Sequence, residues 1–166
     1  MRRLPLRRLG PADAAAFHAF RLEGFVRHPR QFRVAVEDEA GLSLDAVAAR
    51  LSSEHVVGGF DGDGLAGIGG LSRYPGAKLR HKALLWGMYV RESARGTGLA
   101  GAIVEALLAA ARELRVEQVL LTLAADNVPA RRLYERCGFE RYAIEPRAVK
   151  LDEGYFDELL MIRRLP

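Results

Sequence analysis

The segment that most constrains the fold contains an apolar strand, a glycine-rich turn, an amphipathic helix and a second apolar strand, in that order. Residues 83–90 read ALLWGMYV, an almost continuous apolar run that is typical of a strand buried on both faces. Residues 99–114 repeat leucine and isoleucine at helical spacing, and residues 118–124 form the next apolar run. Strands joined through a crossover helix run parallel, so this segment predicts a parallel strand-helix-strand unit inside a sheet.

The flanking sequence adds strands and helices to this unit. Pro5 confines the first strand to an edge, because proline cannot donate to a strand ladder. The turn at 61–64 reads DGDG, and its glycines supply the positive φ that a tight hairpin requires. The expected strands are 3–9, 54–60, 65–71, 83–90, 118–124, 139–144 and 158–164. The expected helices are 12–26, 44–51, 99–114 and a short one from Asn127 to Gly138. The connections 28–41 and 145–158 are expected to be loops. We therefore predict one domain over residues 1–166, of α/β (α+β) class, with a central mixed sheet of six to seven strands flanked by helices.

Composition argues against several classes of function. The 25 basic and 21 acidic residues give a formal charge of +4, but the arginines are scattered among Asp and Glu, so we expect no nucleic-acid partner. The four histidines and Cys137 lack metal-ligand spacing, so no metal is expected, and a lone cysteine permits no internal disulfide. No apolar stretch approaches the roughly 20 residues that cross a bilayer, so we expect a cytoplasmic protein with no membrane partner.

The strongest candidate for a binding site is the segment 95–100, which reads RGTGLA between the central strand and the amphipathic helix. The start of a helix exposes unpaired N–H groups and the positive end of the helix dipole, which together bind phosphate. The glycines let a diphosphate approach the backbone, and Arg95 can add charge-assisted hydrogen bonds. Taken alone, the segment fits a tight strand-to-helix turn without a ligand equally well.

A dinucleotide site is a competing interpretation of the same residues. Gly96, Gly98 and Gly101 satisfy the G-x-G-x-x-G pattern, which is weak when taken alone. The strands before this pattern form a hairpin, and too little chain follows Gly101 to wind the rest of a nicotinamide-binding sheet. The order of the elements therefore opposes this interpretation.

Two motifs together make the chain resemble a known family. Residues 88–90, followed by R-x-x-G-x-A from Arg95 to Ala100, are similar to the central strand and helix start of the GNAT superfamily of N-acetyltransferases. The run N-x-x-A-x-x-x-Y-x-x-x-G-F from Asn127 to Phe139 resembles the second signature of that family. The order of the preceding elements also fits, so the resemblance covers essentially the whole chain and implies a GNAT-like fold.

The resemblance implies an acetyl-CoA-dependent acyltransferase and gives individual residues a role. Met88 and Val90 would offer backbone groups to the pantetheine amides, as an added strand would. The loop N–H groups would bind the pyrophosphate, and Asn127 would bind the cofactor arm where the two central strands separate. The residues implied to bind acetyl-CoA are Met88, Tyr89, Val90, Arg95, Gly96, Thr97, Gly98, Leu99, Ala100 and Asn127.

The resemblance also implies a general acid, Tyr134, which would protonate the departing thiolate. Without the two motifs, an ordinary core tyrosine would be the better interpretation. An acceptor amine with a pKa of about 10.4 must lose a proton before it attacks the thioester. Glu23, Glu145 and His81 are candidate bases, although each is more often a surface or structural residue. Cys137 lies at a helix end, which favours a buried structural thiol over a covalent acyl-enzyme.

The predicted function is transfer of an acetyl group from acetyl-CoA to a primary amine of a small molecule. Two alternatives stay open: a non-catalytic acyl-CoA-binding sensor, which needs the loop but not Tyr134, and a peptide or protein N-acetyltransferase. In the family the acceptor lies against the segments that correspond to 20–33 and 145–158, and their mixed charges suit a small amphoteric amine better than a polycation. Family members are often dimers, so we also consider a homodimer in which the strand 158–164 pairs across the interface.

Overall fold

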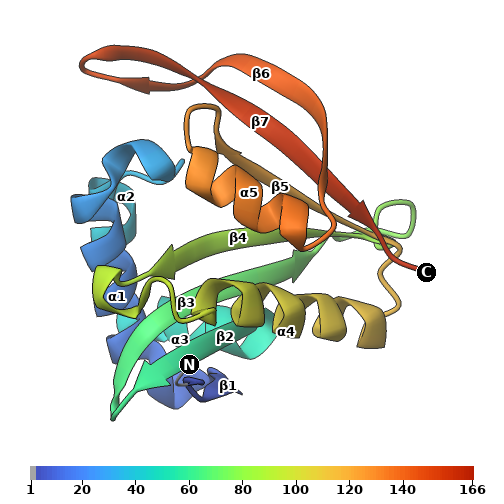
Figure 1. The fold of residues 1–166 in the computed structure, drawn as a ribbon. Helices are drawn as coiled ribbons and strands as arrows, with labels where there is room; N and C mark the ends of the chain where they lie inside the picture. Colours follow the sequence, from blue (N-terminus) through green and yellow to red (C-terminus); the bar gives the residue numbers. More distant parts are fainter. Residues whose placement is uncertain (1–2) are drawn as a thin grey trace.

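Seven strands form one sheet in a computed structural model that describes residues 3–166 of the chain (Figure 1). The strands are β1 (Leu6–Arg8), β2 (His55–Asp61), β3 (Gly64–Arg73), β4 (Lys82–Val90), β5 (Gln118–Ala124), β6 (Glu140–Leu151) and β7 (Gly154–Arg164). Their order across the sheet is β1-β2-β3-β4-β5-β7-β6, and every neighbouring pair is antiparallel except β4 and β5. The predicted mixed sheet with one parallel unit is confirmed, and β1, which follows Pro5, lies at an edge.

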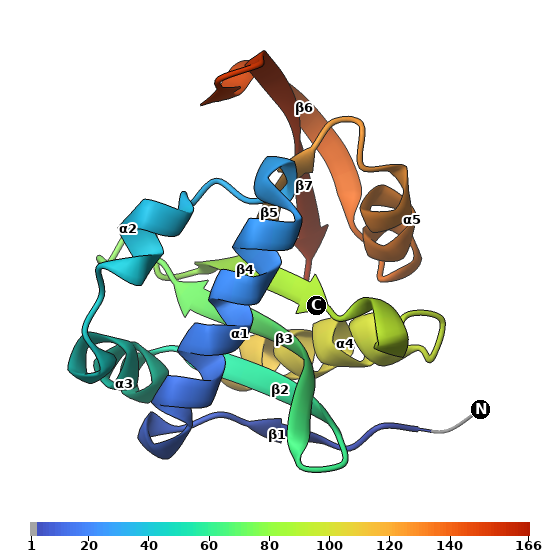
Figure 2. The same cartoon turned by 90° about the vertical axis from the view of Figure 1, so that its left-hand side faces the viewer.

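Helices cover both faces of the sheet. They are α1 (Ala14–Arg27), α2 (Val36–Ala40), α3 (Leu44–Ser53), α4 (Leu99–Glu113) and α5 (Val128–Arg136), with 3-10 turns at Pro11–Asp13, Pro29–Gln31 and Glu92–Ala94. α4 packs over β2, β3 and β4 on one face, and α1 and α3 cover the other face (Figure 2). One apolar cluster surrounds Ile103 and Leu107 of α4, and a second surrounds Phe17 and Phe20 of α1. No helix within residues 3–166 is both long enough and apolar enough to span a membrane.

Local sequence explains where several helices begin and end. Ser43 caps α3, because its Oγ accepts a hydrogen bond from Ala46 N at 3.1 Å. Asn127 caps α5 in the same way through Ala130 N at 3.2 Å. Gly138, just past α5, has φ +83°, the left-handed conformation that glycine adopts without strain. The predicted bounds of α3, α4 and α5 are therefore correct to within two residues.

A short helix that the sequence does not reveal lies between α1 and α3. Residues 28–41 look like a loop in the sequence, because the five residues of α2 are too few to show a helical repeat. In α2 the side chain of Glu39 is only 2% exposed and accepts hydrogen bonds from Arg21 Nε at 2.8 Å and Arg50 Nη1 at 3.3 Å. This buried ion cluster joins α1, α2 and α3, so α2 is held by tertiary contacts.

The hairpin at the end of the chain is longer than predicted. Residues 145–158, expected to form a loop, lie mostly within β6 and β7, which pair almost to the tip. A bulge between Glu145 and Val149 accommodates Pro146, which cannot donate to the ladder. The proline therefore bends the strand instead of ending it, and the predicted end of β6 and the predicted start of β7 are wrong.

The last strand lies inside the sheet. β7 pairs with β5 on one side and with β6 on the other, so the backbone groups along both of its edges are already bonded. The hypothesis of a homodimer in which the strand 158–164 pairs across an interface is therefore wrong. The edge strands are β1 and β6.

Glu39→Gln is expected to destabilise the protein by about 3 to 5 kcal/mol, because it leaves Arg21 buried without its charged partner. The side chains of Arg21 and Glu39 are 5% and 2% exposed. Asp13→Asn is the matched control, since the ion pair that Asp13 forms with Arg7 is much more exposed and its loss should matter little. Urea denaturation at neutral pH measures both changes, and equal losses would contradict the role of the buried cluster.

The same cluster predicts sensitivity to acid. Burial opposes the ionisation of Glu39, but the hydrogen bond from Arg21 and the charges of Arg21 and Arg50 outweigh it and hold the pKa of Glu39 below its ordinary value of 4.5. The stabilisation is therefore complete above that ordinary value and is lost as the pH falls through the lower, folded-state pKa. Denaturation curves from neutral to acid pH should show this loss in the wild type and a smaller one in Glu39→Gln.

Candidate active site

The two parallel strands at the centre of the sheet pair over only three residues each. Residues 82–84 of β4 lie opposite residues 118–120 of β5, and the pairing stops there. Towards Val90 and Ala124 the strands separate (Figure 1). The backbone groups of β4 that face β5 beyond Leu84 are therefore available to an extended ligand, which would bind as an added strand does.

A β-bulge at Gly87 bends β4 where the strands separate. The register with β3 shifts there, so that two residues of β4 face one residue of β3. Gly87 has φ +67°, a conformation that favours glycine. A Cβ at this position would lie 2.7 Å from Nη1 of Arg21, whose guanidinium therefore packs directly against the bulge. The opening between β4 and β5 thus depends on a glycine with a buried cation beside it.

The glycine-rich loop joins β4 to α4 through two left-handed residues. Gly96 has φ +74°, and Gly98, the N-cap of α4, has φ +84°. Both are exposed, and within the described chain their N–H groups donate to no backbone carbonyl. Thr97 Oγ1 donates to Ala94 O at 2.7 Å and accepts a longer hydrogen bond, 3.3 Å, from Leu99 N. The loop therefore presents several free N–H groups at a helix start, a geometry that binds anions.

Two of the predicted cofactor-binding residues contact the connection between α1 and α2. Arg95 Nη2 lies 3.2 Å from His28 Nε2. Asn127 Nδ2 donates a hydrogen bond to Gln31 Oε1, while its Oδ1 caps α5. The turn at 28–31 therefore lies beside both the loop 95–100 and the start of α5, and it brings the two predicted motifs to one place.

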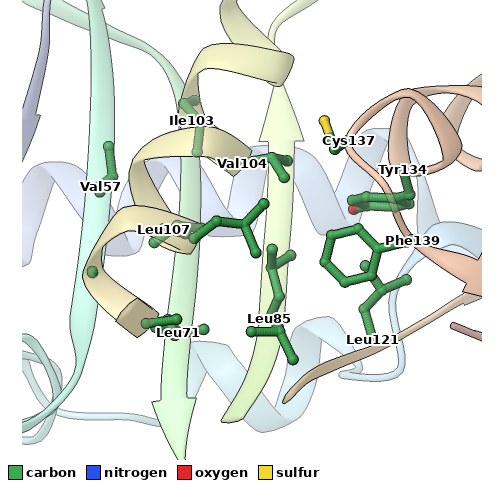
Figure 3. Packing of buried hydrophobic residues seen from close by; sticks show 14 of the residues in the cluster. Val57, Leu71, Leu85, Ile103, Val104, Leu107, Leu121, Tyr134, Cys137 and Phe139 are labelled. Carbon is green, nitrogen blue, oxygen red and sulfur yellow. The ribbon is translucent and has the colours of Figure 1, made fainter. Parts of the chain in front are cut away.

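Tyr134 lies in the apolar core between α5 and the sheet (Figure 3). Its ring packs edge-on against Phe139, with centroids 5.8 Å apart, and extends from α5 towards Val104 of α4. Burial raises the pKa of the hydroxyl above its ordinary value, so this group stays protonated at neutral pH. Among the hydrogen bonds found within residues 3–166, none involves this hydroxyl. Tyr134 is thus a protonated donor without a protein acceptor.

A polar cluster lies on the other face of β4, at the end next to the loop. Glu23 accepts hydrogen bonds from Tyr89 Oη at 2.9 Å and from Arg91 Nε and Nη2 at 3.0 and 2.7 Å. The hydrogen bond from Arg91 lowers the pKa of Glu23, which makes this carboxylate a weak base. The ring of Tyr89 packs on Phe20, so Tyr89 can offer only its backbone to a ligand between the strands.

A second polar cluster joins the α1–α2 connection to the final hairpin. Arg33 Nε donates to Glu158 Oε2 at 2.6 Å, and Arg33 Nη2 donates to Glu145 Oε2 at 2.8 Å. The side chain of Glu158 is 7% exposed, whereas that of Glu145 is 49% exposed. The guanidinium of Arg30 lies 4.0 Å from the ring centroid of Phe156. The two segments expected to line the acceptor site therefore meet in space.

The remaining candidates lie outside this constellation. His81 precedes the first residue of β4, whereas the loop follows the last one, so the two are separated by roughly 30 Å of strand. His81 therefore lies at the end of β4 that is away from the loop, and its role as a base stays a prediction. Cys137 is buried, and burial raises the pKa of its thiol, which agrees with a structural role. Among residues 3–166 no group of three or more His, Cys, Asp or Glu side chains is placed to hold a metal ion.

Sequence reasoning missed two arginines of the site. Arg91 holds Glu23 beside the loop, and Arg21 packs against the bulge. Neither belongs to a motif, and the partners of both lie on other elements. The one signal in the sequence was the position of Arg21, one residue after Phe20 on the apolar side of α1.

Comparisons with known proteins agree with the geometry. The model of the acetyltransferase (GNAT) family matches residues 16–139. The chain is 31% identical over 139 residues to a mycothiol acetyltransferase of Geodermatophilus obscurus. The alignment covers 80% of this chain and 43% of that protein. The chain therefore spans less than half the length of this relative.

Solved structures share the whole fold. An acetyltransferase of the GNAT family from Streptococcus pneumoniae superposes with a TM-score of 0.88 at 21% identity, over 99% of this chain and 100% of the other. The Salmonella typhimurium protein yncA, solved with its cofactor acetyl-CoA, superposes with a TM-score of 0.82 at 19% identity, over 99% and 95% of the two chains. At these identities the likeness establishes the fold.

Gly87→Ala is expected to cost more stability than Gly62→Ala. Both residues have positive φ, +67° and +61°, so each substitution imposes backbone strain of about 1 to 2 kcal/mol. The added Cβ meets nothing within 4 Å at Gly62 but lies 2.7 Å from Arg21 Nη1 at Gly87. Arg21 cannot move away without breaking its buried ion pair with Glu39. Urea denaturation compares the two variants, and equal losses would show that Arg21 yields.

Proposed function

The chain belongs to the acetyltransferase (GNAT) family, and from this membership we propose that it transfers the acetyl group of acetyl-CoA to a primary amine of a small molecule by direct attack. Members of the family are acyltransferases that use acetyl-CoA. The observation that carries the proposal is the separation of β4 from β5 beside a loop with free N–H groups. An extended ligand with a diphosphate at one end matches this pair of features. We also propose that residues 1–166 act as one catalytic domain.

The proposed cofactor contacts are mostly made by backbone groups. The N–H groups of the loop and of the first turn of α4 would hold the pyrophosphate, and the exposed Arg95 would add charge. The backbone of residues 88–90 would bond the pantetheine amides along the strand that β5 leaves unpaired. Asn127 would contact the cofactor arm from the start of α5. Acetyl-CoA would supply the acetyl thioester, and the protein would position it.

We propose that Tyr134 is the general acid. Its hydroxyl is protonated at neutral pH, and no residue of the described chain accepts its proton. The hydroxyl can therefore give its proton to the departing thiolate sulfur, which avoids releasing a charged thiolate into an apolar environment. A tyrosine kept only for packing would not need the hydroxyl.

The acceptor ammonium must also lose a proton, and we propose that this proton leaves through water. Glu23 is bound by Arg91, which lowers the pKa of the carboxyl, and Glu145 is bound by Arg33. A carboxylate held by a guanidinium is a weak base, because protonation would break the ion pair. Glu23 therefore lacks the basicity that the step requires, and Glu145 is occupied by its hydrogen bond from Arg33.

The charges near the opening support a small amphoteric acceptor. Arg33 lies between Glu145 and Glu158, and Arg30 bonds Asp126 at 2.8 Å. This surface therefore offers compensated charges of both signs instead of the acidic groove that a polycation needs. An amino acid or a similar molecule, with an ammonium and a carboxylate close together, fits such a surface.

Tyr134→Phe is expected to lower kcat by about 100-fold or more while the Kd for acetyl-CoA stays unchanged, because general acid catalysis typically contributes this much. Coenzyme A release measures turnover, and calorimetry measures affinity. Gly98→Asp is the matched variant with the opposite expectation: its carboxylate would occupy the phosphate position, so binding should collapse while the fold survives. Unchanged turnover in Tyr134→Phe would exclude Tyr134 as the acid, and unchanged affinity in a folded Gly98→Asp would exclude the proposed cofactor position.

The acceptor class is tested by a panel of amino acids, polyamines, aminoglycosides and peptide N-termini, read by coenzyme A release and product mass. We expect a small amphoteric amine to be preferred. Glu158→Gln should raise the KM for that acceptor more than Glu145→Gln does, because the buried Glu158 fixes Arg33 while Glu145 is half exposed. Preference for polyamines or lysine-rich peptides would contradict the amphoteric acceptor. No coenzyme A release with any acceptor would favour a non-catalytic binding module.

A further inference from the structure

The end of the sheet opposite the phosphate loop carries a hollow of about 460 Å³. Its lining consists of Arg73, Ala77, Arg80, His81, Arg115 and Glu117, and we call it the arginine pocket. The lining comes from the end of β3, the β3–β4 connection and the α4–β5 connection. The loop 95–100 follows the last residue of β4, whereas this pocket lies at the first residue of β4. The two sites are therefore separated by the length of that strand.

Backbone hydrogen bonds hold the segments of the arginine pocket together. His81 O accepts a hydrogen bond from Glu117 N at 2.7 Å, which ties the β3–β4 connection to the α4–β5 connection. Arg80 N donates to Gly76 O at 3.0 Å, and Arg73 Nε donates to Arg80 O at 2.5 Å. The side chains of the pocket therefore start from a preformed frame, which lowers the ordering cost of binding a ligand.

The three arginines of the arginine pocket are exposed, and no ion pair found in the described chain joins them to a carboxylate. Of the ion pairs found within residues 3–166, none involves Arg73, Arg80, His81 or Arg115. Three guanidinium groups and an imidazole thus share one hollow with a single carboxylate, Glu117. The uncompensated charge makes this pocket attractive to an anion.

Arg115 occupies a position where glycine would be less strained. It follows the last turn of α4 with φ +56°, and Val116 N donates to Ala111 O at 2.9 Å, the pattern by which many helices end. A Cβ is unfavourable in this left-handed conformation, so glycine is the usual residue there. Strained residues persist at sites where the side chain is used. Here the strained side chain lines the arginine pocket.

We propose that the arginine pocket binds a small phosphate-bearing molecule. Guanidinium groups bind phosphate through paired, charge-assisted hydrogen bonds, and three of them match a phosphate or diphosphate better than a lone carboxylate. The volume lies in the range of small-molecule sites, about 300 to 1,000 Å³. Glu117 repels a bare anion but accepts a hydrogen bond from a hydroxyl or amino group. The ligand therefore carries such a donor beside its phosphate, as nucleotides and sugar phosphates do.

Titration calorimetry with inorganic pyrophosphate and with adenosine 5′-monophosphate tests this proposal, on protein saturated with acetyl-CoA so that the loop 95–100 is already occupied. Arg115→Gly and Arg80→Gln should each weaken binding by about tenfold, as expected for loss of a hydrogen bond between charged groups. Arg132→Gln is the control of equal charge, since Arg132 is exposed on α5 and belongs to no ion pair found in the described chain. We also expect Arg115→Gly to raise the melting temperature by about 2 to 4 °C, because it relieves the strained φ.

This combination of lower affinity and higher stability separates a binding role of Arg115 from a structural one. The proposal would be overturned if the wild type, Arg115→Gly and Arg80→Gln bound the probes with equal affinity. It would also be overturned if the wild type bound neither probe. A lower melting temperature in Arg115→Gly would show that the arginine is kept for stability, which also overturns it. If the protein bound single-stranded RNA but neither small phosphate, the arginines would belong to a nucleic-acid surface and the proposal would be wrong.

Discussion

The bulge at Gly87 is the constraint on which the candidate site depends. It lies in the pairing of β4 with β3, just beyond the last residues that pair with β5. The bulge bends β4 and leaves its backbone groups unpaired beyond Leu84. The guanidinium of Arg21 packs against this glycine and is itself fixed by Glu39. Contacts on the face of the sheet opposite α4 therefore determine the geometry of the opening between β4 and β5.

The buried cluster around Glu39 extends this constraint to the acceptor side. Glu39 lies on α2 and joins that helix to α1 and α3 through Arg21 and Arg50. α2 directly follows the connection that places His28 beside Arg95 and Arg33 between two carboxylates. Buried ion pairs contribute little net stability compared with apolar packing, so we attribute the value of this cluster to positioning. The same charges thus position the segments on both sides of the proposed site.

The parts of the fold that could be predicted from the sequence are those with local causes. The caps of α3 and α5, the DGDG turn and the loop at 95–100 each depend on residues that are close together in the chain. α2 could not be predicted, because it depends on Glu39 meeting Arg21, 18 positions away. The contact between Arg33 and Glu158 spans 125 positions and leaves no trace in either local sequence. Local motifs could therefore predict the loop at 95–100 and the start of α5, but not the contact between Arg33 and Glu158.

The arginines show why the net charge of +4 says little about function. Around the opening, Arg30, Arg33 and Arg91 are each paired with a carboxylate, so the field there is largely compensated. At the opposite end of β4, no ion pair found within residues 3–166 involves an arginine of the arginine pocket. Field strength depends on this placement and not on the sum of charges. On this basis we propose an amphoteric acceptor for the compensated end and a small phosphate-bearing ligand for the arginine pocket, which is separate from the proposed acetyl-CoA site.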